Sequence, residues 1–265
     1  AQLKGAITRK RYKAATVFAD HYSDLRYVHF MQSVSSDETM YAKQCFERYA
    51  RHHGVKVSHY HCDNGRFADN AFITDVGKQG QSISFCATYA HHQNGKAEKA
   101  IRDLQDLSRT MLLHAKARWP EIIHLSLWPY AMRTACQVIN TLPTRDGGMS
   151  RLENFARVAI QPKIHHFHTF GCPVYMLTKE SEQGKARKWD PRCRIGCYLG
   201  PSPQHAGSVS LVLNLDTAQA TPRFNVAHDD FFETTRHSQS THHVRPVWQK
   251  LARLDQVNAV EARDQ

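Results

Sequence analysis

The chain has 265 residues, with 35 Lys and Arg against 24 Asp and Glu, so its formal net charge is +11 when the 18 histidines are neutral. This length suits one large domain or two ordinary ones, and a hydrophobic content of 41% excludes a wholly disordered chain. The excess of positive charge favours an anionic partner, either nucleic acid or an anionic membrane surface. No apolar run approaches the ~20 residues that cross a bilayer, which argues against an integral membrane protein.

The seven cysteines are odd in number and scattered in spacing, which argues against a secreted disulfide framework and for an intracellular protein. The run His59, His61 and Cys62 has side chains that could bind a soft metal. The same run is also an ordinary polar strand end, and we favour that interpretation.

The first half of the chain predicts a mixed α/β layer fold. Four strand-like runs are expected at 15–20, 26–33, 55–63 and 81–88. A short polar link joins the first two, which predicts an antiparallel hairpin. Helices are expected at about 37–52, where apolar residues recur at helical spacing, just after Asn64-Gly65, and over 96–116. One or two further helices are expected before Pro143, with Pro129 in a first helical turn.

The strong helical periodicity of the sequence ends after Pro143. A weakly periodic connector is followed from Gly171 by short β-rich runs that predict a small barrel or sheet. We therefore divide the chain into an α/β core (1–145), a connector (146–170), a small β-rich domain (171–233) and a flexible tail (234–265) that is helical in part.

Two acids stand in settings typical of catalytic carboxylates. Asp63 ends an alternating strand, and Glu98 lies in the first turn of the long helix after Asn94-Gly95. If the two converge, their oxygens suit Mg²⁺ or Mn²⁺, and two such ions about 4 Å apart can activate a water and stabilise the leaving oxygen of a phosphodiester. Each acid alone also fits a structural role, Asp63 as a turn cap and Glu98 as a helix-capping acid.

The segments that carry these acids resemble the integrase core of copia-type retrotransposon polyproteins. The family's D-N-G strand end with a following Phe corresponds to Asp63-Asn64-Gly65-Arg66-Phe67, and its Q-N-G-x-A-E helix start corresponds to Gln93–Glu98. The strand ATVFAD and the β-rich segments FHTFGCPVYML, KWDPRCRIGCYLG and NVAHDDFFET are also similar to the family, so the resemblance covers about 10–235.

The resemblance implies a ribonuclease H-like fold, with catalytic and metal-binding roles for Asp63 and Glu98 and a Mg²⁺ or Mn²⁺ cofactor. It further implies 3′-end processing and strand transfer on element and target DNA. By the same family argument we expect a homo-oligomer, no membrane association, and location in the nucleus or a cytoplasmic particle.

The sequence departs from the family pattern in two ways. Asp63 and Glu98 are 35 positions apart, one fewer than is usual for the family. The family's first catalytic Asp would fall just upstream of Ala1, and Asp20 matches a different acid of the family, which makes it a poor third ligand. Without that first acid a two-metal site should bind weakly, so a non-catalytic nucleic-acid-binding remnant is the alternative to a strand-transfer domain, and a nuclease of ribonuclease H type is a third option.

Basic residues suggest where nucleic acid would bind. By resemblance, the face of the Glu98 helix would meet DNA, which gives the candidates Gln93, Lys96, Lys99, Arg102 and Arg109. Such a face is also typical of a solvated amphipathic helix. The run KARKWDPRCR at 185–194 has basic residues around Trp189, which suits stacking on nucleic acid. A basic hairpin loop with Trp189 partly packed is the interpretation that we prefer from the sequence.

Overall fold

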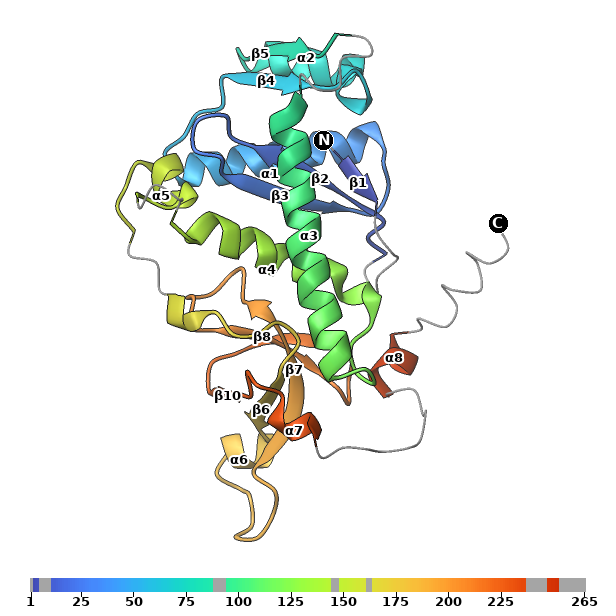
Figure 1. Cartoon of the computed structure of the whole chain (residues 1–265), viewed down its shortest axis with the longest axis vertical. Coiled ribbons are helices and arrows are strands. Elements are labelled where there is room, and N and C mark those ends of the chain that lie inside the picture. The colour runs from blue at the N-terminus through green and yellow to red at the C-terminus, as the bar shows by residue number, and fades with distance from the viewer. Residues whose placement is uncertain are drawn as a thin grey trace, which may run out of the picture. The chain divides into compact units, whose positions relative to one another are not determined.

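A computed structural model describes residues 2–4, 11–87, 94–143, 148–160, 164–236 and 247–252 (Figure 1). The chain forms two compact units. Unit 1 contains Ala1–Asp106 and Ala135–Pro162, and unit 2 contains Leu107–Thr134 and Lys163–Gln265. Two helices, α3 (Gly95–Arg118) and α4 (Trp128–Thr141), contribute one part to each unit. The units therefore interleave along the sequence, unlike the continuous segments expected above.

The predicted mixed α/β organisation of unit 1 is confirmed. The antiparallel hairpin consists of β2 (Ala14–Ala19) and β3 (Arg26–Met31), with Val17 opposite Val28. A parallel pair follows, formed by β4 (His59–Cys62) and β5 (Ser82–Phe85). The helices of this unit are α1 (Ser36–His52), α2 (Asn70–Lys78) and α5 (Arg151–Ala156), together with a 3₁₀ turn at Arg66–Ala68, the first part of α3 and the last part of α4.

A short strand precedes β2 in the sequence and pairs with it. Strand β1 (Gln2–Lys4) runs antiparallel to β2, with Gln2 opposite Thr16. No strand is expected here from the sequence, because three residues are too few for a recognisable periodicity. This strand contains no acidic residue.

Aromatic side chains fill the core of unit 1. Phe18 of β2 stacks on Phe46 of α1, with ring centroids 4.7 Å apart and planes at 6°. Tyr60 of β4 and Phe72 of α2 belong to the same buried cluster, in which their rings meet edge to face at 5.8 Å. Offset and edge-to-face pairs of this kind add to the free energy of burying apolar area, so the cluster ties α1 and α2 to the strands.

A buried lysine lies within this aromatic core. Lys43 of α1 is 0% exposed, and its Nζ lies 2.8 Å from Glu47 Oε1 and 2.7 Å from Asp75 Oδ2 of α2. Glu47 also accepts hydrogen bonds from Tyr60 Oη at 2.9 Å and Gln81 Nε2 at 2.7 Å. Burial works to raise the pKa of Glu47, but the hydrogen bonds from Lys43, Gln81 and Tyr60 outweigh it and hold this pKa below its ordinary value.

We predict that Lys43→Met, which keeps the stem but removes the charge, lowers the free energy of unfolding by about 3–5 kcal/mol at pH 7, because Glu47 and Asp75 lose their buried partner. Since the folded-state pKa of Glu47 is depressed, its contribution is present above the unfolded pKa of about 4.3 and is lost as the pH falls below it. The difference in free energy of unfolding between wild type and Lys43→Met should therefore decrease below pH 4, as measured by urea denaturation. Lys78→Met at an exposed position of α2 is the control, and an equal loss in both variants would contradict the prediction.

The predicted β-rich domain is a five-stranded antiparallel sheet in unit 2, with strand order β10-β6-β7-β8-β9. Its strands are β6 (Pro173–Leu177), β7 (Cys193–Pro201), β8 (Ser210–Asn214), β9 (Ala220–Arg223) and β10 (Val226–His228). Short helices are α6 (Lys179–Glu182), α7 (Glu233–Arg236) and α8 (Val247–Leu251), with 3₁₀ turns at Leu125–Leu127 and Ile164–His166.

Two glycines allow the unit 2 parts of α3 and α4 to approach the sheet closely. Gly171 has φ +79°, and a Cβ placed there would lie 2.6 Å from Ala115 Cβ of α3. Gly200 has φ +102°, and a Cβ there would lie 2.1 Å from Thr134 Oγ1 of α4. Both positions combine a left-handed backbone with no room for a side chain, so they require glycine.

A stacked pair of histidines lies on the sheet of unit 2. The rings of His168 and His228 are 3.5 Å apart between centroids and inclined by 5°. Asp230 Oδ2 lies 2.9 Å from His168 Nδ1, and Ser210 Oγ lies 2.9 Å from His228 Nε2. Burial, followed by the nearby charge of His168, lowers the pKa of His228 to about 4.

We predict that unit 2 loses stability as the pH falls from 6.5 to 4. Over this window an unfolded His228 takes up a proton near its ordinary pKa of about 6.5, whereas the folded one does not until about pH 4. Unfolding then binds more protons, so the unfolding midpoint temperature should fall with falling pH. His228→Gln should flatten this dependence in thermal melts, and the exposed His165→Gln should leave it unchanged. Identical pH profiles for wild type and His228→Gln would refute it.

Candidate functional site

Asp63 is held at the end of the parallel strand pair. It directly follows β4 and is partly buried. On one side the amide of Cys86 donates to the carbonyl of Cys62 at 3.0 Å, and on the other Asn64 Nδ2 donates to the carbonyl of Cys86 at 2.8 Å. These two hydrogen bonds fix the backbone on both sides of Asp63. The predicted strand end is confirmed, although β4 is shorter than the expected 55–63.

Glu98 lies in the first turn of α3, as expected, and it is exposed. Asn94, immediately before the helix, is 7% exposed, so the start of the helix is anchored in the protein. The positive end of the helix dipole favours a negative charge at this position. The opposite face of this helix packs against the protein, where Ala100, Leu104 and Ser108 are buried.

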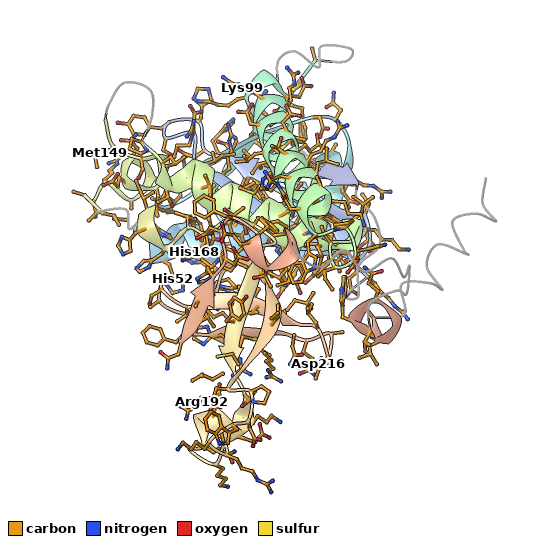
Figure 2. All side chains as sticks on the ribbon, turned by 60° about the horizontal axis from the view of Figure 1, so that its bottom comes forward. His52, Lys99, Met149, His168, Arg192 and Asp216 are labelled. Atoms are coloured by element: carbon orange, nitrogen blue, oxygen red, sulfur yellow. The ribbon has the colours of Figure 1, made fainter. Side chains whose placement is uncertain are left out.

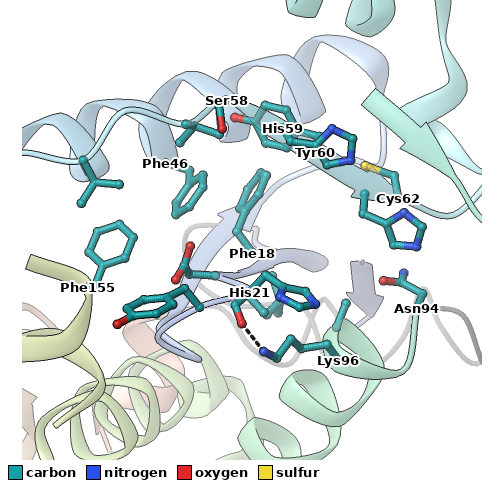
Figure 3. A pocket seen from close by; sticks show the side chains of 18 of the residues that line it. Phe18, His21, Phe46, Ser58, His59, Tyr60, Cys62, Asn94, Lys96 and Phe155 are labelled. Carbon is teal, nitrogen blue, oxygen red and sulfur yellow. Dashed lines mark hydrogen bonds between the residues drawn. The ribbon is translucent and has the colours of Figure 1, made fainter. Parts of the chain in front are cut away.

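The end of β4 and the start of α3 both line a cavity of about 810 Å³ in unit 1. It is lined by the end of β2, by β4 with the residues before it, and by the start of α3. Figure 3 shows Cys62 and Asn94 at one end of this pocket and Phe155 at the other. Neither the Asp63 nor the Glu98 side chain is part of the lining, so the convergence of their two carboxylates stays a prediction.

Lys96, a candidate for DNA contact, is engaged within unit 1. Its Nζ lies 2.9 Å from Asp24 Oδ1, and it also donates to the carbonyl of His21 (Figure 3). Lys96 therefore fastens the start of α3 to the turn between β2 and β3. Because the ion pair is exposed, its contribution to stability is small, but it orients the helix end beside the cavity.

Asp20, the poor third ligand, has a structural role. Its Oδ2 accepts hydrogen bonds from the amide and the hydroxyl of Ser23, both at 2.7 Å. These bonds close the turn after β2, in the way that Asp side chains commonly do. Asp20 lines the cavity, but this oxygen is already occupied by two donors.

The remaining basic candidates lie along the exposed side of α3. Arg102 and Arg109 follow Glu98 at positions i+4 and i+11, so the three share one helical stripe, and all are exposed. Lys99 is exposed next to this stripe. Arg109 belongs to the unit 2 part of the helix. Gln93 lies outside the described residues.

Metal binding at Asp63 depends on the donor groups around it. Within the described ranges, no three His, Cys, Asp or Glu side chains gather where they could hold an ion. Two carboxylates that converge would suit one hydrated Mg²⁺, which keeps several waters and commonly takes one or two carboxylates plus substrate phosphates, and would be too few for a pair of ions.

The soft-metal interpretation of His59, His61 and Cys62 has little structural support. The rings of His59 and His61 each lie 2.8 Å from Ser84 Oγ. Burial, the largest cause, raises the pKa of Cys62 to about 12, so its thiol stays protonated and is a poor ligand at neutral pH. These histidines are part of a polar strand surface, as we preferred from the sequence.

Sequence reasoning missed Asn64 as a positioning residue, since D-N-G indicates only a turn. The available signal was an Asn after one parallel strand, where it can reach the end of the next.

We predict that Asn64→Ala lowers the free energy of unfolding by about 1 kcal/mol in urea denaturation, because the carbonyl of Cys86 loses its donor. Asn70→Ala at an exposed site is the control, and an equal effect of both substitutions would count against this role.

The chain is similar in sequence to proteins of transposable elements. No protein-family model matches the chain. It is 24% identical over 229 residues to the retrovirus-related Pol polyprotein from transposon RE1 of Arabidopsis thaliana, and 23% identical over 238 residues to that from transposon RE2. These matches cover 84% and 87% of the chain but only 14% and 15% of the relatives. The chain is thus similar to a short part of LTR-retrotransposon Pol polyproteins, as the sequence motifs indicated.

Solved structures with some likeness to the chain are retroviral integrases. The HTLV-2 integrase catalytic core domain in complex with magnesium covers 58% of this chain and 90% of its own, at 21% identity and a TM-score of 0.43. A simian T-cell lymphotropic virus intasome in complex with a PP2A regulatory subunit covers 85% and 77%, at 19% identity and a TM-score of 0.45. Separately, none of the described helices combines the length and apolar character needed to cross a membrane.

Proposed function

We propose that this chain is the integrase-type part of a retrotransposon Pol polyprotein, with a ribonuclease H-like unit 1 that binds DNA and takes part in strand transfer. The observation that carries the proposal is the cavity shared by the end of β4 and the start of α3, because it brings together the two segments that bear the motif acids. The similarity to Pol polyproteins over 84–87% of the chain supports it.

The proposed roles follow from the positions of the side chains. Asp63, fixed by the hydrogen bonds on either side, and Glu98, at the positive end of α3, would hold a hydrated Mg²⁺ or Mn²⁺. The ion supplies Lewis-acid stabilisation of the phosphodiester oxygens when it is bound. Lys99, Arg102 and Arg109 would contact phosphates along the exposed side of α3 and position the DNA without reading its sequence.

A non-catalytic nucleic-acid-binding role is the second candidate. It is favoured by the lack of a third metal ligand among the described residues, together with the net charge of +11. In this case the chain would bind DNA with a steep salt dependence but would not cleave or join it. By the family argument, we further propose that the protein acts as a homo-oligomer, in the nucleus or in a cytoplasmic particle.

We predict that Glu98→Gln and Asp63→Asn each lower Mn²⁺-dependent nicking or strand transfer of plasmid DNA by more than about 100-fold, since even outer-shell changes at metal sites cost 10- to 100-fold. Both variants should fold and bind DNA as the wild type does. Glu121→Gln removes an exposed acid of unit 2 and is the control.

Two results separate the candidate functions. Wild-type DNA binding without any nicking would favour the non-catalytic role, and a gain of activity after an Asp-bearing strand is added upstream of β1 would trace that inactivity to the missing acid. Activity that survives Glu98→Gln unchanged would overturn the assignment of the site.

A further inference from the structure

A second basic surface lies in unit 2. In the sequence it is far from Asp63 and Glu98, the acids of the candidate site. It is the segment 185–194, called here the basic loop, which connects α6 to β7. Figure 1 shows α6 and this loop projecting beyond strands β6 and β7, and Figure 2 labels Arg192 within the projecting part. Backbone hydrogen bonds define its base, from Thr178 N to Arg192 O at 2.9 Å and from Lys185 N to Glu180 O at 2.7 Å.

Trp189 stands at the turn of the basic loop and is 88% exposed. The preference from the sequence, that Trp189 is partly packed, is therefore wrong. The turn is closed by hydrogen bonds from Asp190 N to Arg187 O and from Arg187 N to Asp190 Oδ2, both at 3.2 Å. A local turn thus presents the indole to solvent, whereas Trp128 and Trp248 are 8% and 3% exposed. Trp189 is the most exposed of the large apolar side chains among the described residues, so its ring is accessible to a partner.

Positive charge surrounds the exposed ring. Lys185, Arg187, Lys188 and Arg192 are all exposed. Lys188 Nζ lies 5.5 Å from the centre of the Trp189 ring, which is a cation–π contact. In the described part of the chain, none of these four side chains forms a salt bridge with a carboxylate. The only acid of the loop, Asp190, is occupied by the turn.

We propose that the basic loop binds an unpaired stretch of nucleic acid, with Trp189 stacked on a base and Lys185, Arg187 and Arg192 against the neighbouring phosphates. An exposed aromatic face among cations is the combination that single-strand-binding proteins use, since every unpaired base offers a face for stacking. A duplex hides these faces within its own stack. An anionic membrane would also attract the cations, but an interfacial anchor needs several apolar side chains, and here only Trp189 is large and apolar.

The inference goes beyond the proposed function and needs neither Asp63 nor Glu98. Its test therefore uses the full chain in EDTA, where no metal-dependent step can occur. The probe is fluorescein-labelled oligo(dT) of 20 nucleotides, followed by anisotropy at low salt. Trp189→Ala should weaken binding by about 5- to 100-fold, and Trp189→Phe, which keeps a ring, by less. Phe224→Ala removes an aromatic ring that is 66% exposed elsewhere in unit 2, and it should leave binding within twofold of wild type.

Two further measurements distinguish stacking from general attraction of charge. Oligo(dT) should quench the tryptophan fluorescence of the wild type, and this quenching should disappear in Trp189→Ala. In the double variant Arg187→Gln/Arg192→Gln, the slope of log K against log salt should fall in magnitude by about 1.4, or about 0.7 for each phosphate that is no longer neutralised.

Three comparisons complete the test. Glu121→Gln, which removes an exposed acid of unit 2 outside the basic loop, should bind oligo(dT) as the wild type does. Oligo(U) in place of oligo(dT) shows whether the unpaired strand is RNA as well as DNA. A blunt duplex of equal length should bind with little dependence on Trp189. Equal affinity of Trp189→Ala and wild type for oligo(dT), or Trp189-dependent binding to anionic vesicles but not to oligo(dT), would overturn the proposal.

Discussion

A single buried ammonium group holds the helices of unit 1 against the strand that leads to the candidate site. Lys43 forms salt bridges with Glu47 of its own helix and with Asp75 of α2. Glu47 in turn accepts a hydrogen bond from the hydroxyl of Tyr60 in β4. Because these charges lie inside an aromatic cluster, each depends on the others for its compensation. The network thereby constrains β4 from both helices, and the backbone that carries Asp63 is the continuation of that strand.

Local hydrogen bonds and an exposed ion pair then position the two segments that border the cavity. Asn64 and the amide of Cys86 join the ends of β4 and β5, while Lys96 ties the start of α3 to the turn after β2. Side chains that would otherwise be candidates for chemistry are thus used for positioning. This division of roles suits a site in which few groups act directly and rigid elements hold them in place.

The sequence predicted what depends on periodicity and turn chemistry. The hairpin, the helix at 36–52, the long helix from Gly95 and the β-rich second part follow from spacing of apolar residues and from glycine, proline and asparagine. Long-range partnerships were not predictable. Lys43 looks like a surface residue, β1 is too short for a pattern, and the basic residues around Trp189 fit both a packed and an exposed ring. The pairing of Asn64 with Cys86 likewise depends on which strand lies alongside.

The interleaving of the two units has a consequence for how such a protein can be divided or exchanged. Gly171 and Gly200 of unit 2 accept Ala115 and Thr134 from helices that begin or end in unit 1. Separation of α3 and α4 from the small sheet would expose apolar surface of the sheet to water. It would also leave empty the space beside Gly171 and Gly200 that Ala115 and Thr134 fill. An exchange of segments between related chains should therefore transfer both parts together, with the points of exchange outside the stretch from α3 to β7.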